Sequence, residues 1–167
     1  ESHGTYWVNL PDFSSSIESL QVQRGVGTST NGSGAFGSSI NILTDGVSDD
    51  PYAEISNSFG SYDSRKHTVK FSSGLINDSV EISGRLSKID SDGYVDRAFS
   101  DLKSYFLQGA YKRGNTFLKA LAFGGHEKTY QAWDGLSKEQ IKENRRQNPL
   151  TYENEIDNYK QDHYQMH

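Results

Sequence analysis

The chain lacks cysteine, which excludes disulfide bonds, thiolate metal sites and a cysteine nucleophile. It also lacks a basic excess, because 17 Lys and Arg residues stand against 22 Asp and Glu residues and the formal net charge is -5. Nucleic-acid-binding domains carry a basic surface, so nucleic acid is not an expected partner. The sequence contains no run of about 18 apolar residues, and this excludes a transmembrane helix.

Hydrophobic residues are scarce, at 33% of 167 residues, although 12% of the residues are aromatic. Disordered chains are poor in aromatic residues, so this composition favours long strands in which polar and apolar residues alternate. The only methionine is Met166, and the last residues, 164–167, lie inside an expected strand. We therefore expect this sequence to be a piece of a longer protein.

From residue 52 to residue 127, apolar and polar residues alternate with the period of two that is typical of strands with one exposed face. Tight turns at 77–78 and 112–115 alternate with a longer loop at 90–101. Strands of soluble sandwiches usually have about 5–6 residues, whereas strands of transmembrane barrels need about 9–11 and are joined by short turns on one side and long loops on the other. The pattern favours the barrel. The strand at 116–127 is apolar on both faces, and its orientation stays open.

The alternation also predicts which side chains share a face of the sheet. A polar set should face inward, namely Thr68, Lys70, Ser72, Glu81, Ser83 and Arg85. An apolar set should face outward to lipid, namely Val69, Phe71, Val80, Ile82, Leu86 and Tyr105. The N-terminal unit and the strands should pack with their polar faces together.

Residues 1–45 form a separate unit in this interpretation. Pro11 and Asp12 introduce a short turn or helix, a strand ends at Arg24, and a second strand follows over 39–44. The glycine-rich loop between these strands resembles half of a P-loop, but Ser33 stands where the phosphate-binding lysine is required. The acidic, breaker-rich segment 45–51 indicates a boundary.

A second helix signal lies far along the chain. Ser137 and Gln140 have the spacing of a capping box, which predicts a helix over 138–147 that ends before Pro149. Its side chains are mostly charged, so we expect a solvated helix within a long loop.

The sequence contains no catalytic constellation and no strong metal site. The pattern Gly-x-Ser-x-Gly does not occur. His163 and His167 lie four residues apart in an expected strand, which separates them by about 13 Å, too far for one metal ion. We expect no enzyme activity, no cofactor and no metal.

Two aromatic groups are candidates for ligand contact. Tyr6 and Trp7 lie beside His3, and they would either fill the core of the N-terminal unit or form a binding surface. Tyr130, Trp133 and Asp134 stand where a strand leaves the sheet, and they would serve as an interface girdle, as loop packing or as ligand contacts.

One pair of segments resembles a known family. Residues 17–25 (Ile-Glu-Ser-Leu-Gln-Val-Gln-Arg-Gly) and 34–44 (Gly-Ala-Phe-Gly-Ser-Ser-Ile-Asn-Ile-Leu-Thr) resemble the closing part of the plug domain of TonB-dependent outer-membrane receptors. The family pattern is a strand ending in Arg-Gly, a loop of the form Gly-x-x-Ala-x-Gly-Gly and a strand of the form Ile-Asn-Ile-x-Thr. Ser38 replaces the last Gly of that loop. Segments 91–97 and 129–135 also look like the first barrel loops of this family.

The resemblance implies a membrane β fold: a fragment of a large antiparallel transmembrane β-barrel, about 22 strands when complete, with the C-terminal part of its lumenal α+β plug. Residues 1–45 would close the plug, 46–51 would be the linker, and 52–167 would supply the first five to six barrel strands. A long extracellular loop would span about 129–158.

By the same resemblance, the protein would be an importer in the bacterial outer membrane that takes up a ferric siderophore or a cobalamin-type nutrient. Its partners would be the energy-transducing TonB complex, whose binding segment lies outside this chain, outer-membrane lipid, a small-molecule ligand and, as a further candidate, a surface lipoprotein. The alternative is a structural or adhesive β-protein, or a passive outer-membrane pore.

The resemblance also implies roles for single residues. Arg24 matches the family arginine that pairs with barrel glutamates, so it would lock the plug to the barrel, with partners beyond residue 167. His3, Tyr6 and Trp7 would lie at the outward-facing apex of the plug and touch the ligand.

Overall fold

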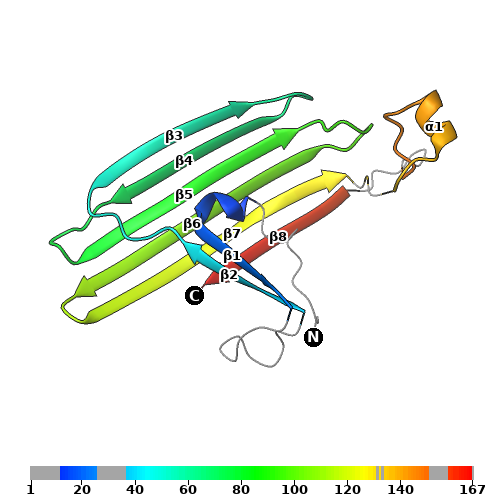
Figure 1. Cartoon of the computed structure of the whole chain (residues 1–167). Helices are drawn as coiled ribbons and strands as arrows, with labels where there is room; N and C mark the ends of the chain where they lie inside the picture. The colour runs from blue at the N-terminus through cyan, green and yellow to red at the C-terminus, as the bar shows by residue number, and fades with distance from the viewer. Residues whose placement is uncertain (1–11, 26–36, 131, 133, 151–157, 167) are drawn as a thin grey trace.

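The computed structural model describes residues 12–25, 37–130, 132 and 134–150, together with the backbone of 158–166. These residues form two antiparallel sheets, one of two strands and one of six (Figure 1). Strands account for most of the described chain, so the expectation of a β-rich fold is confirmed.

The described part of the N-terminal unit begins at Asp12 and the 3-10 helix η2 (Phe13–Ser16), the short turn or helix that the Pro11-Asp12 pair predicts. Strand β1 (Ile17–Arg24) then pairs with β2 (Ser38–Thr44) in an antiparallel ribbon. Leu20 lies opposite Ile42, and Val22 lies opposite Ile40. Such β-branched and aliphatic cross-strand pairs stabilise a two-stranded ribbon.

The large sheet has the order β3-β4-β5-β6-β7-β8, so each strand pairs with its neighbours in sequence. It is an open sheet whose edges are β3 and β8. The strands are β3 (Pro51–Phe59), β4 (Arg65–Ser73), β5 (Val80–Ser91), β6 (Ser100–Arg113), β7 (Thr116–Tyr130) and β8 (Asn158–Met166). Their lengths run from 9 to 15 residues, well above the usual 5–6.

The connections differ between the two ends of the large sheet. At one end, β6 and β7 are joined by Gly114 and Asn115, and β4 and β5 are joined by residues 74–79. Asn77 and Asp78 both adopt the left-handed conformation there, with φ of 50° and 53°, which asparagine and aspartate tolerate better than most residues. The other end carries the short turn 60–64 between β3 and β4, residues 92–99, and the chain between β7 and β8, so the predicted alternation of short turns and longer loops is present from β4 onward.

The two predicted residue sets occupy opposite faces of this sheet. We call the face that carries Thr68 and Arg85 the inner face, because the N-terminal unit lies across it (Figure 1). Thr68, Ser72, Glu81 and Arg85 are each at most 7% exposed. On the opposite, outer face, the members Val69, Val80, Ile82 and Leu86 are 38–54% exposed. The face assignment is confirmed, and Lys70, Ser83, Phe71 and Tyr105 follow it in the strand register.

Strand β7, whose orientation the sequence left open, turns Phe123 to the inner face. Phe123 and Phe106 stack with their ring centroids 6.1 Å apart, and Phe13 of η2 lies 4.9 Å and 6.3 Å from them, respectively. Phe106 and Phe123 are 3% and 8% exposed. The inner face is therefore not uniformly polar, because it carries an aromatic cluster where Phe13 covers it.

The helix α1 (Lys138–Glu143) has the predicted capping box: the Ser137 side chain accepts from the Gln140 amide, and the Gln140 side chain accepts from the Ser137 amide. The helix is shorter than the predicted 138–147. Asn144 is extended at φ -147°, and its side-chain oxygen accepts a hydrogen bond from the Arg146 amide, which ends the helix. No helix in the described part of the chain has the length and apolar character needed to cross a membrane.

Gly74 and Gly114 offer a matched test of how the linker packs on the sheet. Both have positive φ, +63° and +57°, but a Cβ on Gly74 would lie 2.6 Å from the Pro51 nitrogen and 2.8 Å from the Asp49 oxygen, whereas a Cβ on Gly114 meets nothing within 4 Å. Both Gly→Ala changes incur the left-handed cost of about 1–2 kcal/mol. Gly74→Ala should lower the free energy of unfolding in urea by a further 1–3 kcal/mol, approximately, because backbone atoms must shift. Equal losses in the two variants would contradict this packing.

Candidate functional site

The most elaborate arrangement of polar side chains joins the N-terminal unit to the inner face of the large sheet. At its centre lies a group that we call the Asp12 cluster, which consists of Asp12, Ser15, Ser16, Lys66, Arg85, Ser87 and Ser104. Three of these residues come from the N-terminal unit, and four come from strands β4, β5 and β6. The cluster therefore connects segments that are more than 50 residues apart in sequence.

The Asp12 carboxylate forms ion pairs with two basic side chains. Arg85 Nη1 lies 2.8 Å from Asp12 Oδ2, and Lys66 Nζ lies 2.7 Å from Asp12 Oδ1. The side chains of Arg85 and Asp12 are only 3% and 5% exposed. Ser87 also donates a hydrogen bond to Asp12 Oδ2, and Ser15 donates one to Asp12 Oδ1 at 2.6 Å.

The guanidinium of Arg85 is satisfied by more than the ion pair. Arg85 Nε donates to Ser16 Oγ at 2.7 Å, and Nη1 donates to Ser104 Oγ at 3.1 Å. A buried charge is costly unless it is paired and hydrogen-bonded. Arg85 has an ion-pair partner, Asp12, and a hydrogen-bond partner, Ser16, in the N-terminal unit. The position of that unit therefore depends on Arg85.

Local structure explains why Asp12 can reach the sheet. Asp12 has φ 52°, a left-handed conformation, and the Ser15 amide donates to its carbonyl at 3.3 Å to begin η2. This short turn points the carboxylate and the Ser15 and Ser16 hydroxyls toward the sheet. Burial alone would raise the pKa of Asp12, but the hydrogen bonds from Lys66, Ser15 and Ser87 and the charge of Arg85 hold the pKa below its usual value of 3.8.

The linker that follows β2 makes a second set of contacts with the inner face. Lys119 Nζ donates to Thr44 Oγ1 at 3.0 Å and to the Asp45 carbonyl at 2.9 Å. The Asp45 carboxylate lies 3.5 Å from Lys70 Nζ. Lys70 and Lys119 therefore anchor the C-terminal end of the ribbon, while Arg85 anchors its beginning.

A third contact buries Glu81, which is 1% exposed. Its Oε1 accepts from the Ser72 hydroxyl at 2.6 Å and from the Ser48 amide at 3.1 Å, and its Oε2 accepts from Gln108 Nε2 at 3.3 Å. The Ser48 contact ties the linker to the sheet. Because each oxygen has a donor, the buried carboxylate is hydrogen-bonded within the sheet and to the chain that crosses it.

The long-loop end of the sheet has its own polar contacts. Arg146 Nε donates to the Tyr94 carbonyl at 2.8 Å, and the Asp96 amide donates to the Arg146 carbonyl at 2.7 Å. Asn148, which is 4% exposed, donates to the Asp96 carbonyl at 3.1 Å. The loop after β5 and the segment after α1 are thus held together, and they border a hollow of about 550 Å³ lined by Tyr94, Val95, Asp134, Leu136, Ile141, Arg145 and Gln147.

The predicted ligand residues fall into different surroundings. Asp134 is exposed and lines the loop hollow, so it is accessible to a ligand there. Tyr130 is 4% exposed, its hydroxyl donates to the Leu150 carbonyl at 3.3 Å, and the Arg97 guanidinium lies 4.7 Å above its ring. This environment favours the loop-packing interpretation of Tyr130. Trp133, His3, Tyr6 and Trp7 lie outside the described residues.

The predicted lock residue, Arg24, lies at the exposed end of β1, opposite Ser38. None of the ion pairs within the described residues involves Arg24. The carboxylate partners that the resemblance implies would lie beyond residue 167, so the role of Arg24 stays a prediction. Among the described residues, Arg85 makes the buried ion pair between the two units.

Sequence reasoning placed Arg85 and Lys70 on the inner face but did not identify Asp12 as their counterpart in the N-terminal unit. One signal was present: Lys66, Lys70 and Arg85 all occupy inner positions in the predicted alternation, and such a group of cations requires acidic partners. Residues 12–25, 37–130, 132 and 134–150 contain no group of three or more His, Asp or Glu residues that could hold a metal ion.

Comparison of the chain with protein-family models, with curated proteins and with solved structures finds no match. The arrangement of charges and faces is therefore the basis for inferring what the chain does.

The buried ion pair predicts a strong and local effect of Asp12→Asn. The change leaves Arg85 buried without an anion, which costs about 3–5 kcal/mol, so amide hydrogen exchange in β1 and β2 should become more than about a hundredfold faster. Asp63→Asn is the matched control, because Asp63 pairs with Arg65 at 2.6 Å but is 58% exposed; such a surface pair contributes at most about 1 kcal/mol. Similar exchange rates in the two variants would show that Asp12 does not hold the unit.

The lowered pKa of Asp12 predicts that this contact weakens in acid. A carboxylate whose pKa is lower in the folded protein contributes stability above its unfolded pKa, about 3.9, and the contribution disappears as the pH falls through the folded pKa. The difference in unfolding free energy between wild type and Asp12→Asn should be constant from pH 7 to about 5 and should shrink at lower pH. A difference that persists unchanged to pH 2 would contradict this assignment.

Proposed function

We propose that this chain is part of a TonB-dependent outer-membrane receptor that imports a scarce nutrient, a ferric siderophore or a cobalamin-type molecule. In this proposal the N-terminal unit is the end of the plug, residues 46–51 are the linker, and the six-stranded sheet is the beginning of the barrel wall. The observation that carries the proposal is that the sheet is inverted relative to a sheet of a soluble protein. Its charged face is buried under the N-terminal unit, and its apolar face is exposed.

An inverted sheet is unfavourable in water. The outer face exposes Ile55, Ile82, Leu86 and Leu118 at 53–72% of their surface, and a contiguous apolar surface of this kind marks contact with a partner or a membrane. The same face is favourable in lipid, because strands of membrane barrels turn apolar side chains outward and polar ones to the lumen.

The extent of the apolar band supports the same conclusion. On the outer face of β6, the charged residues Lys103 and Arg113 enclose Tyr105, Leu107 and Tyr111. From Lys103 to Arg113 the strand extends about 33 Å, which a tilt of roughly 40° reduces to about 25 Å, the height of the apolar band on outer-membrane barrels. Tyr105 and Tyr111 lie just inside the two charged ends, where barrels carry their aromatic girdles.

The polar interface also suits a plug that must be displaced. Ion pairs and hydrogen bonds such as those of Arg85 and Asp12 can be exchanged for bonds to water when the two surfaces separate. An apolar interface of the same size would resist separation, because its surface gains nothing from hydration. The energy-transducing complex would pull on a segment outside this chain to break these contacts.

The remaining assignments follow from the resemblance. The loops around Tyr94 and Asp134 would be extracellular, and Asp134, Trp133 and the plug residues His3, Tyr6 and Trp7 would contact the ligand. Arg24 would add a second plug–barrel ion pair, and a surface lipoprotein is a further candidate partner.

A passive pore or an adhesive β-protein is the alternative function. Neither requires a unit that covers the polar face of the sheet through buried charges, and this covering is why we favour the importer. The two functions differ in whether transport depends on energy and on movement of the N-terminal unit.

A tether between the two units tests this difference. The Ser15 hydroxyl accepts a hydrogen bond from Lys66 Nζ at 2.7 Å, so a Ser15→Cys/Lys66→Cys protein can be bridged by a short, cleavable bifunctional thiol reagent while Asp12 and Arg85 stay intact. In cells that carry the energy-transducing complex, the bridge should abolish uptake of radiolabelled ferric siderophores or cobalamin, and reduction should restore it.

The matched control is Asn57→Cys/His67→Cys, because these side chains are hydrogen-bonded at 2.6 Å between two strands of the sheet itself. Its bridge should leave uptake unchanged. Uptake that continues through the Ser15–Lys66 bridge, or that is equal in cells without the energy-transducing complex, would exclude the energised importer and favour the passive pore.

A further inference from the structure

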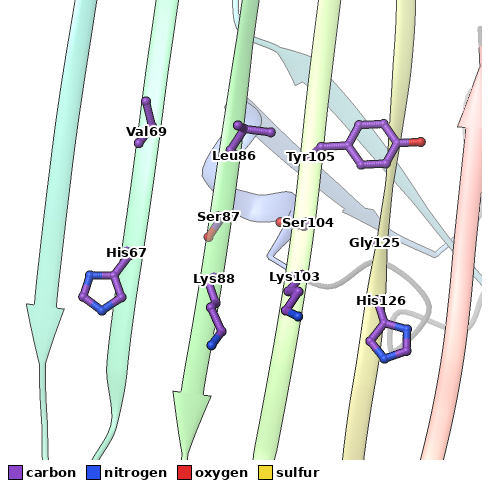
Figure 2. Close-up of a pocket in the computed structure, with 10 residues that line it drawn as sticks. All are labelled: His67, Val69, Leu86, Ser87, Lys88, Lys103, Ser104, Tyr105, Gly125 and His126. Atoms are coloured by element: carbon purple, nitrogen blue, oxygen red, sulfur yellow. The ribbon is translucent and has the colours of Figure 1, made fainter.

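Four basic side chains form a straight row across the outer face near the long-loop end of the sheet. The strand register places His67 opposite Lys88, Lys88 opposite Lys103, and Lys103 opposite His126. Figure 2 shows these side chains side by side on strands β4 to β7. Neighbouring strands are about 4.8 Å apart, so the row extends about 14 Å. We call this set the basic row.

An apolar hollow adjoins the basic row. In the next row of outer positions, Val69 lies opposite Leu86, and Leu86 lies opposite Tyr105. Val69 and Leu86 are 39% and 53% exposed, and these residues together with the basic row border a hollow of about 520 Å³. In Figure 2 the Tyr105 ring lies over β7, and the residue opposite Tyr105 in the register is Gly124.

The charges around the row leave it positive. The next outer row toward the loops contains Arg65, Asp90, Asp101 and Lys128 on β4 to β7, whose formal charges cancel, and Lys128 lies opposite Lys160 of β8. Lys88 lies 3.1 Å from Asp90, but both side chains are at least 36% exposed, and an exposed pair of this kind is weak. In the register, His126 also lies opposite Asp162 of β8. On strands β4 to β7, the positive excess at this edge of the apolar band therefore resides in Lys88 and Lys103 of the basic row.

The position of the basic row relative to the apolar band indicates which kind of ligand it binds. The basic row lies at the boundary between the exposed apolar surface and the long-loop end. The geometry points to a binding site for a lipid with an anionic phosphate head group, whose phosphate lies on the basic row and whose acyl chains lie on Val69 and Leu86. This inference rests on the proposed function, because it takes the outer face as the lipid-facing surface and the long loops as its outer side.

The chemistry of the row suits a phosphate on a lipid better than a free anion. Lysine ammonium groups bind phosphate as point charges, and each of them has three N–H donors. A free phosphate would gain nothing from the apolar hollow, whereas a lipid buries its chains there. Basic residues next to an apolar membrane surface attract anionic lipids by about fivefold in affinity per residue.

Native mass spectrometry of the protein in neutral detergent tests the site, with phosphatidic acid as the probe. Lys88→Gln/Lys103→Gln should weaken phosphatidic acid binding about 30-fold. The matched control is Lys112→Gln/Arg113→Gln, which removes the same charge from exposed residues at the other end of β6, and it should leave the affinity unchanged. Circular dichroism confirms that each variant has kept its strands.

Three results would overturn the inference. The first is equal affinity in wild type and both variants. The second is equal binding of phosphatidylcholine with the same acyl chains, which would show contact with the chains alone. The third is displacement of the lipid by inorganic phosphate at equal concentration, which would show a free-anion site. These three results concern only the lipid site. If uptake still depends on the energy-transducing complex, the proposed function stands even when the lipid site is absent. If uptake does not depend on that complex, the tether experiment contradicts the proposed function whatever the lipid measurements show.

Discussion

The buried guanidinium of Arg85 is the constraint on which the rest of the structure depends. Arg85 lies in the middle of a β-strand with its side chain 3% exposed, and a charge in that position needs an anion and further hydrogen-bond acceptors. Its neighbours in the sheet supply the hydroxyl of Ser104, but the carboxylate comes from Asp12 and another hydroxyl comes from Ser16. The sheet therefore requires the N-terminal unit to complete its own inner face.

The same requirement recurs along the inner face. Lys70 and Lys119 find their acceptors on the chain that leaves β2, and Glu81 binds the Ser48 amide of the linker. Between these polar contacts, Phe13 covers the rings of Phe106 and Phe123. The interface thus combines a small aromatic centre, which gains from burial, with charged contacts that set the register of the two units. Such charged contacts contribute more to geometry than to net stability.

The middle of the outer face carries mainly apolar side chains, because the polar residues of these strands point inward. Strands turn successive side chains to opposite sides, so the inward position of Thr68, Lys70 and Arg85 forces Val69 and Leu86 outward. The exposed apolar band and the tyrosines inside its edges follow from this alternation. The membrane location that we propose is the environment in which both faces are satisfied at once.

Much of this architecture could be predicted from local pattern. The two-residue alternation identified the strands and the faces of both residue sets, the turn at 77–78 was evident from its residue types, and the Ser137–Gln140 spacing identified the capping box. Each of these signals acts over a few residues, where sequence and structure are directly linked. The predicted end of α1 was wrong by several residues, because the Asn144 side chain accepts a hydrogen bond from the Arg146 amide and ends the helix earlier.

What the sequence could not reveal depends on contacts between distant segments. The sequence by itself determined the strands, the two faces of β4 and β5 and the inward position of Lys70 and Arg85, because these depend on neighbours two to four residues away. Only the tertiary structure decided that Asp12 pairs with Arg85 across 73 residues, that Phe13 packs against Phe123 on the inner side of β7, and that Tyr130 contacts Leu150 and Arg97. The physical reason is that an ion pair, a ring stack or a buried hydroxyl depends on which surfaces are in contact in space. The separation of two residues along the sequence does not specify whether their surfaces are in contact.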